Sequence, residues 1–247
     1  MELGSIALLV VAGLVGGACN AVAGGGTFFT FPALLGVGVP PVAANATSAI
    51  AIWPGHATSL FGYREELTRQ AGHLKSSAPP FVLGSVIGAL LLALTGNGLF
   101  RQLIPWLLLA ATLLFAVGPK LRAWISASRS GVLPRPVPFL IDLLVAIYGG
   151  YFGAGLGILL MAVLTLIGLD DVNEANAVKN ALATIVSSLA VVVFVATGII
   201  AWGPGAAVLS GAVAGGYLGA RFARWINPKI LRGIVIAVGL GLTWFYF

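Results

Sequence analysis

Long hydrophobic runs separated by short polar segments follow one another along the whole chain. Each run is about 17 to 25 residues long, enough for an α-helix to cross a hydrocarbon core of about 30 Å. The runs lack the alternation over about ten residues that is typical of an outer-membrane barrel strand. The pattern therefore predicts an all-α polytopic membrane protein.

The hydrophobic pattern repeats once, at a constant offset of 131 residues. With this offset residues 23–115 align without a gap on residues 154–246, and Asn45 falls on Asn176. In a membrane protein, a duplicated unit of this size is typical of a secondary transporter whose site lies where the copies meet. Further identical pairs are Ala23 and Ala154, Gly24 and Gly155, Gly26 and Gly157, Gly84 and Gly215, Gly88 and Gly219, and Arg101 and Arg232.

Each copy is expected to contain five helical segments. In the first copy they are Leu3 to Ala23, Gly26 to Leu35, Ala43 to Phe61, Ser77 to Leu94 and Leu99 to Val117. In the second copy they are Val137 to Phe152, Gly157 to Ile167, Ala175 to Thr197, Trp202 to Phe222 and Lys229 to Phe247. The second segments, 26–35 and 157–167, are too short to span a bilayer comfortably, so each forms either a re-entrant hairpin or a tilted, broken pair with the first segment.

The segments predict two inverted-topology repeats with about eight to ten segments in total. A hairpin returns the chain to the side it came from, so each copy crosses the membrane an odd number of times. Two tandem copies with an odd number of crossings are inverted relative to one another. The expected organisation is a first transmembrane repeat at 1–121, a basic, proline-containing cytoplasmic linker at 122–136 and a second repeat at 137–247.

Composition agrees with a membrane protein. Only 8% of the residues are charged, 59% are hydrophobic and the mean hydropathy is +1.05, which is too apolar for a soluble chain of 247 residues. The single cysteine, Cys19, excludes an internal disulfide and a cysteine-based metal cluster. The chain opens Met1-Glu2 without a basic segment, so the first run is expected to stay as a helix rather than act as a cleaved signal peptide.

Basic residues lie mainly in three of the polar segments. Segments 62–76, 118–136 and 221–232 hold most of the 13 lysines and arginines, and the segment count puts all three on one face. The positive-inside rule makes that face cytoplasmic and puts both termini outside, in the periplasm, for a protein of the cell inner membrane. The basic residues behind the net charge of +6 are therefore expected to set the orientation of the chain in its lipid bilayer. They are not expected to bind a nucleic acid. The oligomeric state is open, a homo-oligomer included.

Glycine clusters mark the break between the first and second segments of each copy. They are Gly24-Gly25-Gly26-Thr27 in the first copy and Gly153, Gly155 and Gly157 in the second. Glycine costs about 1 kcal/mol relative to alanine in a helix interior, so the backbone is expected to open there. The amides that follow, such as those of Thr27 and Ile158, would offer a helix N-terminus to an anion. The alternative is close helix packing of the small-xxx-small kind.

Each third segment carries a polar stripe on an otherwise apolar helix. Positions three and four apart share a helix face, so Asn45 joins Ser48. In the second copy Asn176 joins Lys179 and Asn180 on one face. These polar groups could orient a bound anion, or they could form hydrogen bonds between helices.

Lys179 is the most informative of these residues. A lysine in an apolar segment is costly and is usually retained for a ligand or a partner. The alternative is a snorkelling lysine paired with Glu174 or Asp171. The acidic loop at 170–174 is expected to cap the third segment, and it holds too few ligands for a metal, so neither a metal site nor a cofactor is expected.

His56 and Asp142 are the candidate groups for a coupling proton, because both lie inside predicted segments. His56 shares the helix face of Asn45, and a free histidine titrates near neutrality. Structural roles are open for both residues: a hydrogen-bonded histidine at His56, and an ion pair with Arg135 at Asp142.

Motifs in both copies point to one family. They are Gly24-Gly25-Gly26-Thr27 with Pro32, Gly38-Val39-Pro40, Asn45-Ala-Thr47-Ser48, Gly153-Ala-Gly155, Asn176-Ala-Val-Lys179-Asn180, and Gly215 to Arg221. Together they resemble the sulfite exporter TauE/SafE family, over essentially the whole chain. The resemblance implies a small, duplicated membrane transporter of sulfur-containing anions such as sulfite, sulfoacetate or related sulfonates.

Residues and resemblance lead to one hypothesis, a secondary transporter and not an enzyme. It would bind a sulfonate or sulfur oxyanion near mid-membrane between the two copies and move it by alternating access. The rivals are a channel-like anion facilitator and a non-transporting accessory protein. The residues expected to contact the anion are Gly24, Gly25, Gly26, Thr27, Asn45, Ser48, Gly155, Gly157, Asn176, Lys179 and Asn180.

Overall fold

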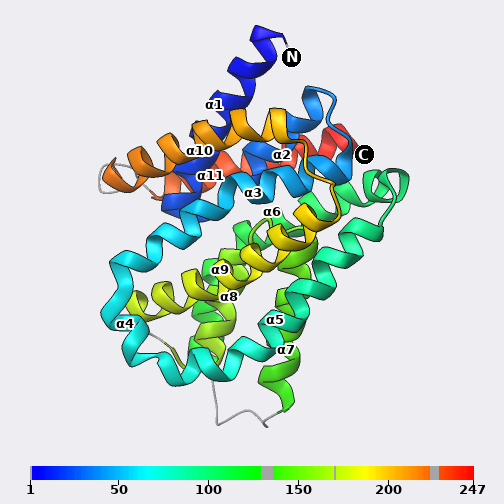
Figure 1. Ribbon diagram of the computed structural model, residues 1–247. Helices are drawn as coiled ribbons and strands as arrows, with labels where there is room; N and C mark the ends of the chain where they lie inside the picture. Colours follow the sequence, from blue (N-terminus) through cyan, green and yellow to red (C-terminus); the bar gives the residue numbers. More distant parts are fainter. Residues whose placement is uncertain (1, 129–135, 170, 223–227) are drawn as a thin grey trace.

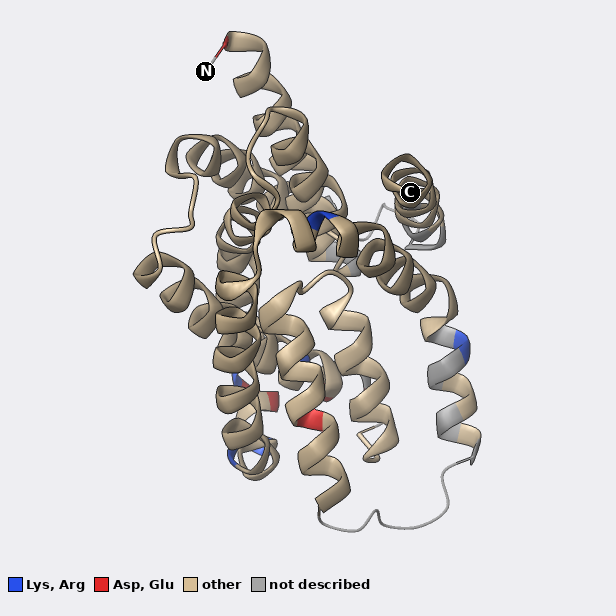
Figure 2. Ribbon diagram, turned by 90° about the vertical axis from the view of Figure 1, so that its right-hand side faces the viewer, with Lys and Arg blue, Asp and Glu red and all other residues tan. Residues whose placement is uncertain are grey.

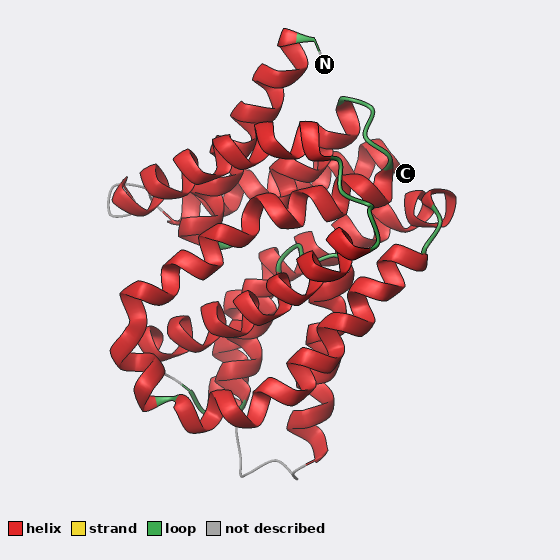
Figure 3. Cartoon of the chain, in the orientation of Figure 1, coloured by secondary structure: helices red, strands yellow, loops and turns green. Residues whose placement is uncertain are grey.

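The computed structural model describes residues 2–128, 136–169, 171–222 and 228–247, and within these ranges the chain is helical, with short connections and no strand (Figure 3). In chain order the helices are α1 Leu3–Ala23, α2 Thr27–Gly36, α3 Pro41–Ser59, the 3-10 turn η1 Leu60–Tyr63, α4 Arg64–Arg69, α5 Ala71–Leu94, α6 Asn97–Ser128, α7 Pro136–Tyr151, α8 Leu156–Leu166, α9 Val172–Ala196, α10 Trp202–Phe222 and α11 Pro228–Tyr246.

Every segment expected from hydrophobicity is a helix in the structure, with shifted ends. α5 begins at Ala71 rather than Ser77, and α6 continues to Ser128 rather than ending at Val117. The first part of the expected linker is therefore helical, and its residues 129–135 lie outside the described ranges. The short helix α4 was not expected, because its sequence is polar and buries no residue that could produce a hydrophobic stripe.

The helices are those of a membrane protein. Charged residues are sparse along them (Figure 2). Four described helices are long and apolar enough to cross a membrane by length and composition, and the shorter apolar helices include α2 and α8. The prediction of an all-α polytopic membrane protein is thus confirmed, while the way in which α2 and α8 sit in the bilayer stays a prediction. The four candidate spans are Leu3–Ala21, Ala71–Leu94, Asn97–Gly118 and Asn173–Ala196.

Helices from the two halves of the chain pack in exchanged pairs. α1 packs against α10, and α5 packs against α7 (Figure 1). In each pair, the first segment of one copy meets the fourth segment of the other. α3 contacts α9 and α6 contacts α11, so like segments also meet. This set of contacts is unchanged when the halves are exchanged, as a two-fold relation requires. The inversion of the copies across a membrane and the domain bounds stay predictions.

Glycines let the exchanged pairs approach backbone to backbone. A Cβ atom added to Gly13 of α1 would lie 2.1 Å from a carbonyl oxygen of α10, and one on Gly215 of α10 would lie 1.9 Å from a carbonyl oxygen of α1. A Cβ on Gly88 of α5 would likewise lie 2.1 Å from a carbonyl oxygen of α7. Membrane helices commonly pack in this way, because small residues at the interface let the two backbones approach closely.

Aromatic rings fill the space between α2, α6 and the end of α7. Phe31 packs edge to face against Phe100 and Phe152, with ring centroids 6.4 and 5.7 Å away. Phe100 also packs against Tyr151, with centroids 5.8 Å apart. Edge-to-face packing of buried rings stabilises beyond the area it buries. We call these four residues the aromatic cluster.

Candidate functional site

A cavity of about 710 Å³ lies between helices of the two halves, bounded by α1, α3, α8, α9 and α10. We call it the large cavity, and its volume is in the range of sites for small molecules. Of the residues expected to bind an anion or a coupling proton, those that line it are Gly24, His56, Gly157, Asn176, Lys179 and Asn180.

Among the described residues that line the large cavity, Lys179 is the one lysine or arginine, and none is an aspartate or glutamate. Its Nζ donates a hydrogen bond to Oδ1 of Asn176, 2.9 Å away and one helical turn earlier on α9. This bond occupies the acceptor of the amide and leaves Nδ2 of Asn176 as a donor. A Cβ added to Gly157 would lie 3.8 Å from Cδ of Lys179, so the start of α8 borders the lysine stem. The lysine and amides therefore offer the N–H donors that an anion requires.

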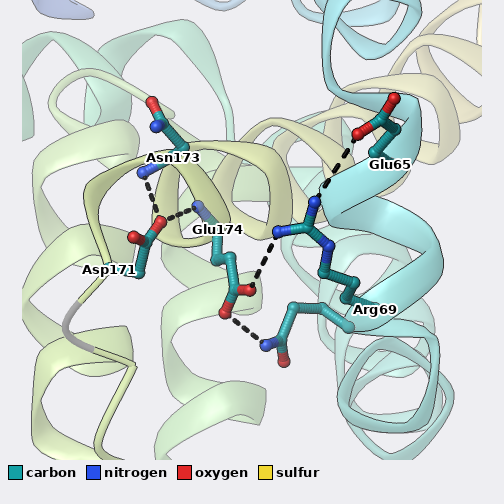
Figure 4. Close-up of polar contacts among 6 residues, drawn as sticks. Glu65, Arg69, Asp171, Asn173 and Glu174 are labelled. Carbon is teal, nitrogen blue, oxygen red and sulfur yellow. Dashed lines mark hydrogen bonds and ion pairs between the residues drawn. The ribbon is translucent and has the colours of Figure 1, made fainter.

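The described carboxylates of the acidic loop, Asp171 and Glu174, have partners other than Lys179, and Figure 4 draws these contacts. Oδ1 of Asp171 accepts hydrogen bonds from the amides of Asn173 and Glu174, at 2.9 and 2.8 Å, which confirms its expected role as the cap of α9. Glu174 accepts a bond of 2.7 Å from Gln70 and lies 3.9 Å from Arg69. These contacts tie α9 to α4 and to the residue after it. Lys179 is thus hydrogen-bonded to Asn176 and paired with neither of these carboxylates, while a snorkelling role for the lysine stays a prediction.

Four polar or aromatic residues of the large cavity were not expected from the sequence. Asn20 carried a usable signal, because it is an amide inside the apolar segment of α1. The other three carried none, since a hydroxyl or a tyrosine near a helix end is common at membrane interfaces. They are Thr58, Tyr63 and Tyr217.

A second cavity, of about 40 Å³, adjoins the first. We call it the small cavity. Ile52 and His56 line both cavities, so these residues stand between them. The polar residues Thr27, Asn45 and Ser187 line the small cavity and not the large one. Two of the expected anion ligands, Thr27 and Asn45, are therefore separated from Lys179.

Several expected ligands are used in packing instead. Ser48 is fully buried, and its hydroxyl shares a hydrogen bond of 2.6 Å with that of Thr30. A Cβ on Gly25 would lie 2.9 Å from the ring of Phe115, and one on Gly26 would lie 2.6 Å from a carbonyl oxygen of α1. Ser48, Gly25 and Gly26 line neither cavity, and neither does Gly155. The close-packing alternative accounts for Gly25 and Gly26.

Two further expectations differ from the structure. The amide of Ile158 donates to the carbonyl of Gly155, 3.0 Å away, so it is not a free donor as expected. The first turn of α8 closes with tight bonds to a residue three positions earlier, and such bonds use up the amides of a helix start. Asp142 is buried beside Ser77 and His73 of α5 and lines neither cavity. Its alternative partner, Arg135, lies outside the described residues.

Gly155 is expected to be needed for the break between α7 and α8. Its φ of 75° is left-handed, a conformation that costs other residues about 1 to 2 kcal/mol. We predict that Gly155→Ala lowers the melting temperature of the purified protein in detergent, whereas Gly157→Ala, at a helical position, does not. Equal melting temperatures for the two variants would contradict a structural role for the left-handed glycine.

Within the described residues no group of three or more histidine, cysteine, aspartate or glutamate side chains is placed to hold a metal ion. The polar groups that line the two adjoining cavities are amides, hydroxyls, one histidine and one lysine. Such a set can bind small ions by hydrogen bonds and charge.

Comparison with known proteins gives one family and several relatives. A family model described as "Sulfite exporter TauE/SafE" matches residues 9–245. A "Probable membrane transporter protein" of Haemophilus influenzae is 29% identical over 98% of this chain and 97% of its own length. A "Probable membrane transporter protein ORF9" of Sinorhizobium sp is 29% identical over 96% of this chain and 90% of its own, and "Probable membrane transporter protein YfcA" of Escherichia coli K12 is 28% identical over 94% and 86%. No solved structure matches the chain significantly.

Proposed function

Because the chain belongs to the sulfite exporter TauE/SafE family and is a membrane transporter of that type, we propose that it carries a sulfonate or a sulfur oxyanion across the cell inner membrane. The anion binds in the large cavity, between the two halves of the chain. Transport, and not catalysis, is the activity of the protein.

The observation that carries this proposal is the lysine without a carboxylate partner in the large cavity. Nζ of Lys179 is held by Asn176, and Asn180 and Asn20 add amide groups around the same space. A half-buried positive charge that is paired with no carboxylate of the described residues favours an anionic ligand. Sulfite, thiosulfate and sulfonates carry several acceptor oxygens and no donor beyond an acid proton, and these acceptors match the donors of the lysine and the amides.

Alternating access is supported by the two ends of the site. Three residues that line the large cavity, Thr58, Tyr63 and Tyr217, lie in or near the basic segments 62–76 and 221–232 in the sequence. If those segments are cytoplasmic, the cavity opens inward. Beyond the small cavity, the aromatic cluster closes the other end, since Phe152 belongs to both. Rocking of one half against the other would open that end and close the first.

The rival is a channel-like facilitator, and kinetics separates the two. We predict that the protein in liposomes takes up labelled sulfite or sulfoacetate with saturable rates, and that unlabelled anion inside accelerates the uptake by counterflow. A thermal-shift panel with sulfite, thiosulfate, sulfoacetate, taurine and small carboxylates would identify the preferred anion beforehand. A flux that neither saturates nor shows counterflow would support the channel, and a panel in which no sulfur anion raises the melting temperature would contradict the proposed substrate class.

A further inference from the structure

The small cavity contains a buried acceptor that has no donor. Asn45 is 3% exposed, and its Oδ1 accepts no hydrogen bond from any described residue. The orientation of the amide is fixed, because its Nδ2 donates to the backbone oxygen of Tyr151, 2.9 Å away. Turning the amide over would bring two oxygens together. A buried acceptor left without a partner costs free energy, so this atom favours a ligand that brings a hydrogen-bond donor or a positive charge.

The surroundings of this atom also favour positive charge. Helix α7 ends at Tyr151, and Gly149, Gly150 and Phe152 line the small cavity. The last carbonyl groups of a helix have no partner within the helix and carry a partial negative charge. At the break after a half-helix, such carbonyl ends coordinate the coupling cation of many secondary transporters. The cavity therefore lies at a point where backbone and side chain both present oxygen.

Further oxygen ligands come from the two halves of the chain. Thr27 at the start of α2 and Ser187 of α9 line the small cavity with Asn45. Hydroxyl, amide and carbonyl oxygens are the ligands that hard cations take. Among the described residues no aspartate or glutamate lines this cavity, so no carboxylate there balances the two charges of calcium or magnesium. A volume of about 40 Å³ accepts one dehydrated ion or a few waters.

We propose that the small cavity binds a single sodium ion, with Asn45 Oδ1, the hydroxyls of Thr27 and Ser187 and the end of α7 as ligands, and that this ion is carried together with the anion. Ile52 and His56 line both cavities, so the ion would lie close to the large cavity. Lys179 repels the ion as long as its own charge is uncompensated, and an anion between the two positive charges removes that repulsion. Each ion therefore raises the affinity of the other. The coupling rests on the proposed function, whereas the sodium site does not.

The test measures sodium directly on the purified protein, without any anion substrate. Melting temperatures are compared in NaCl, KCl and choline chloride at one ionic strength, and binding of ²²Na⁺ is measured by scintillation proximity. Two variants remove one ligand each at nearly constant shape, Thr27→Val and Ser187→Ala. The matched control is Thr197→Val, because Thr197 is exposed at the end of α9, bonds only to its own helix and lines neither cavity.

We expect about 100 mM sodium to raise the melting temperature of the wild type and of Thr197→Val by about 3 °C or more over choline. Thr27→Val and Ser187→Ala should lose most of this rise and most of the ²²Na⁺ binding. Equal rises in all three salts, or an unchanged sodium response in both ligand variants, would overturn the site and leave a cavity that holds water only. If one variant does not fold, the other and the wild-type ²²Na⁺ measurement still decide.

Anion uptake separates the two proposals. Saturable uptake that proceeds equally without sodium would end the coupling inference and leave the proposed function standing. If the purified protein responds to sodium but transports no sulfur anion, the sodium site would stand and the proposed function would be contradicted.

Discussion

Lys179→Met is expected to reduce anion uptake by proteoliposomes about 10- to 100-fold at subsaturating substrate. Methionine keeps the length and packing of the lysine stem beside Gly157, but it removes the positive charge and the donors. A hydrogen bond to a charged group contributes about 1.5 to 3 kcal/mol, and this is the contact that the anion would lose. The loss should appear as a lower initial rate and as the absence of a thermal shift with the preferred anion.

Lys75→Met is the matched control for the lysine variant. Lys75 is exposed on α5 and lines neither cavity, so the same change of charge should leave uptake unaltered. Lys179→Arg separates charge from shape, because guanidinium keeps the charge in a larger, planar form and should restore part of the uptake. Full activity of a well-folded Lys179→Met protein would exclude the large cavity as the anion site.

Gly13→Val is expected to prevent the normal assembly of the two halves. The added Cβ would lie 2.1 Å from the carbonyl oxygen of Val208 and 2.9 Å from the amide nitrogen of Ala212, both backbone atoms of α10. Backbone cannot yield as a side chain does, so α1 would have to separate from α10 along its length. Overpacking typically costs about 1 to 3 kcal/mol and occasionally more, and a clash with backbone belongs at the upper end of that range. We expect low yield, a broad size-exclusion profile and a melting temperature at least about 5 °C lower.

Gly4→Val provides the comparison on the same helix. Gly4 is exposed, and a Cβ there meets nothing within 4 Å. This variant should be purified in normal yield and melt like the wild type. If Gly13→Val behaved like Gly4→Val, α1 and α10 could not pack as closely as they do in the structure.

The order and kind of the helices could be predicted from the sequence, because hydrophobic runs in a bilayer leave few alternatives to helix. The glycine breaks were also predictable, and they occur where α1 ends at Gly24 and α8 begins after Gly155. The hydrophobic pattern could not predict which helices pack against one another. The exchange of α1 and α5 onto α10 and α7 depends on contacts between residues far apart in the chain.

The candidate site was predictable only where one helix builds it. Asn176, Lys179 and Asn180 share a face of α9 by spacing alone, and all three line the large cavity. Ser48 satisfied the same spacing rule, but its face is turned to Thr30 of α2. Asn45 lies next to a different cavity, for which the position of the α7 end was required. Spacing gives the shared face of a helix, and only packing decides what that face meets.

The exchanged pairs also bear on how the protein is made. Helix α1 enters the membrane early in synthesis, but its glycine face fits against α10, which is among the last helices to be made. Until then the face has only lipid or another protein to contact, whereas α5 and α7 can meet soon after one another. The α5–α7 pair can therefore form early, whereas the α1–α10 pair has to wait until α10 is inserted.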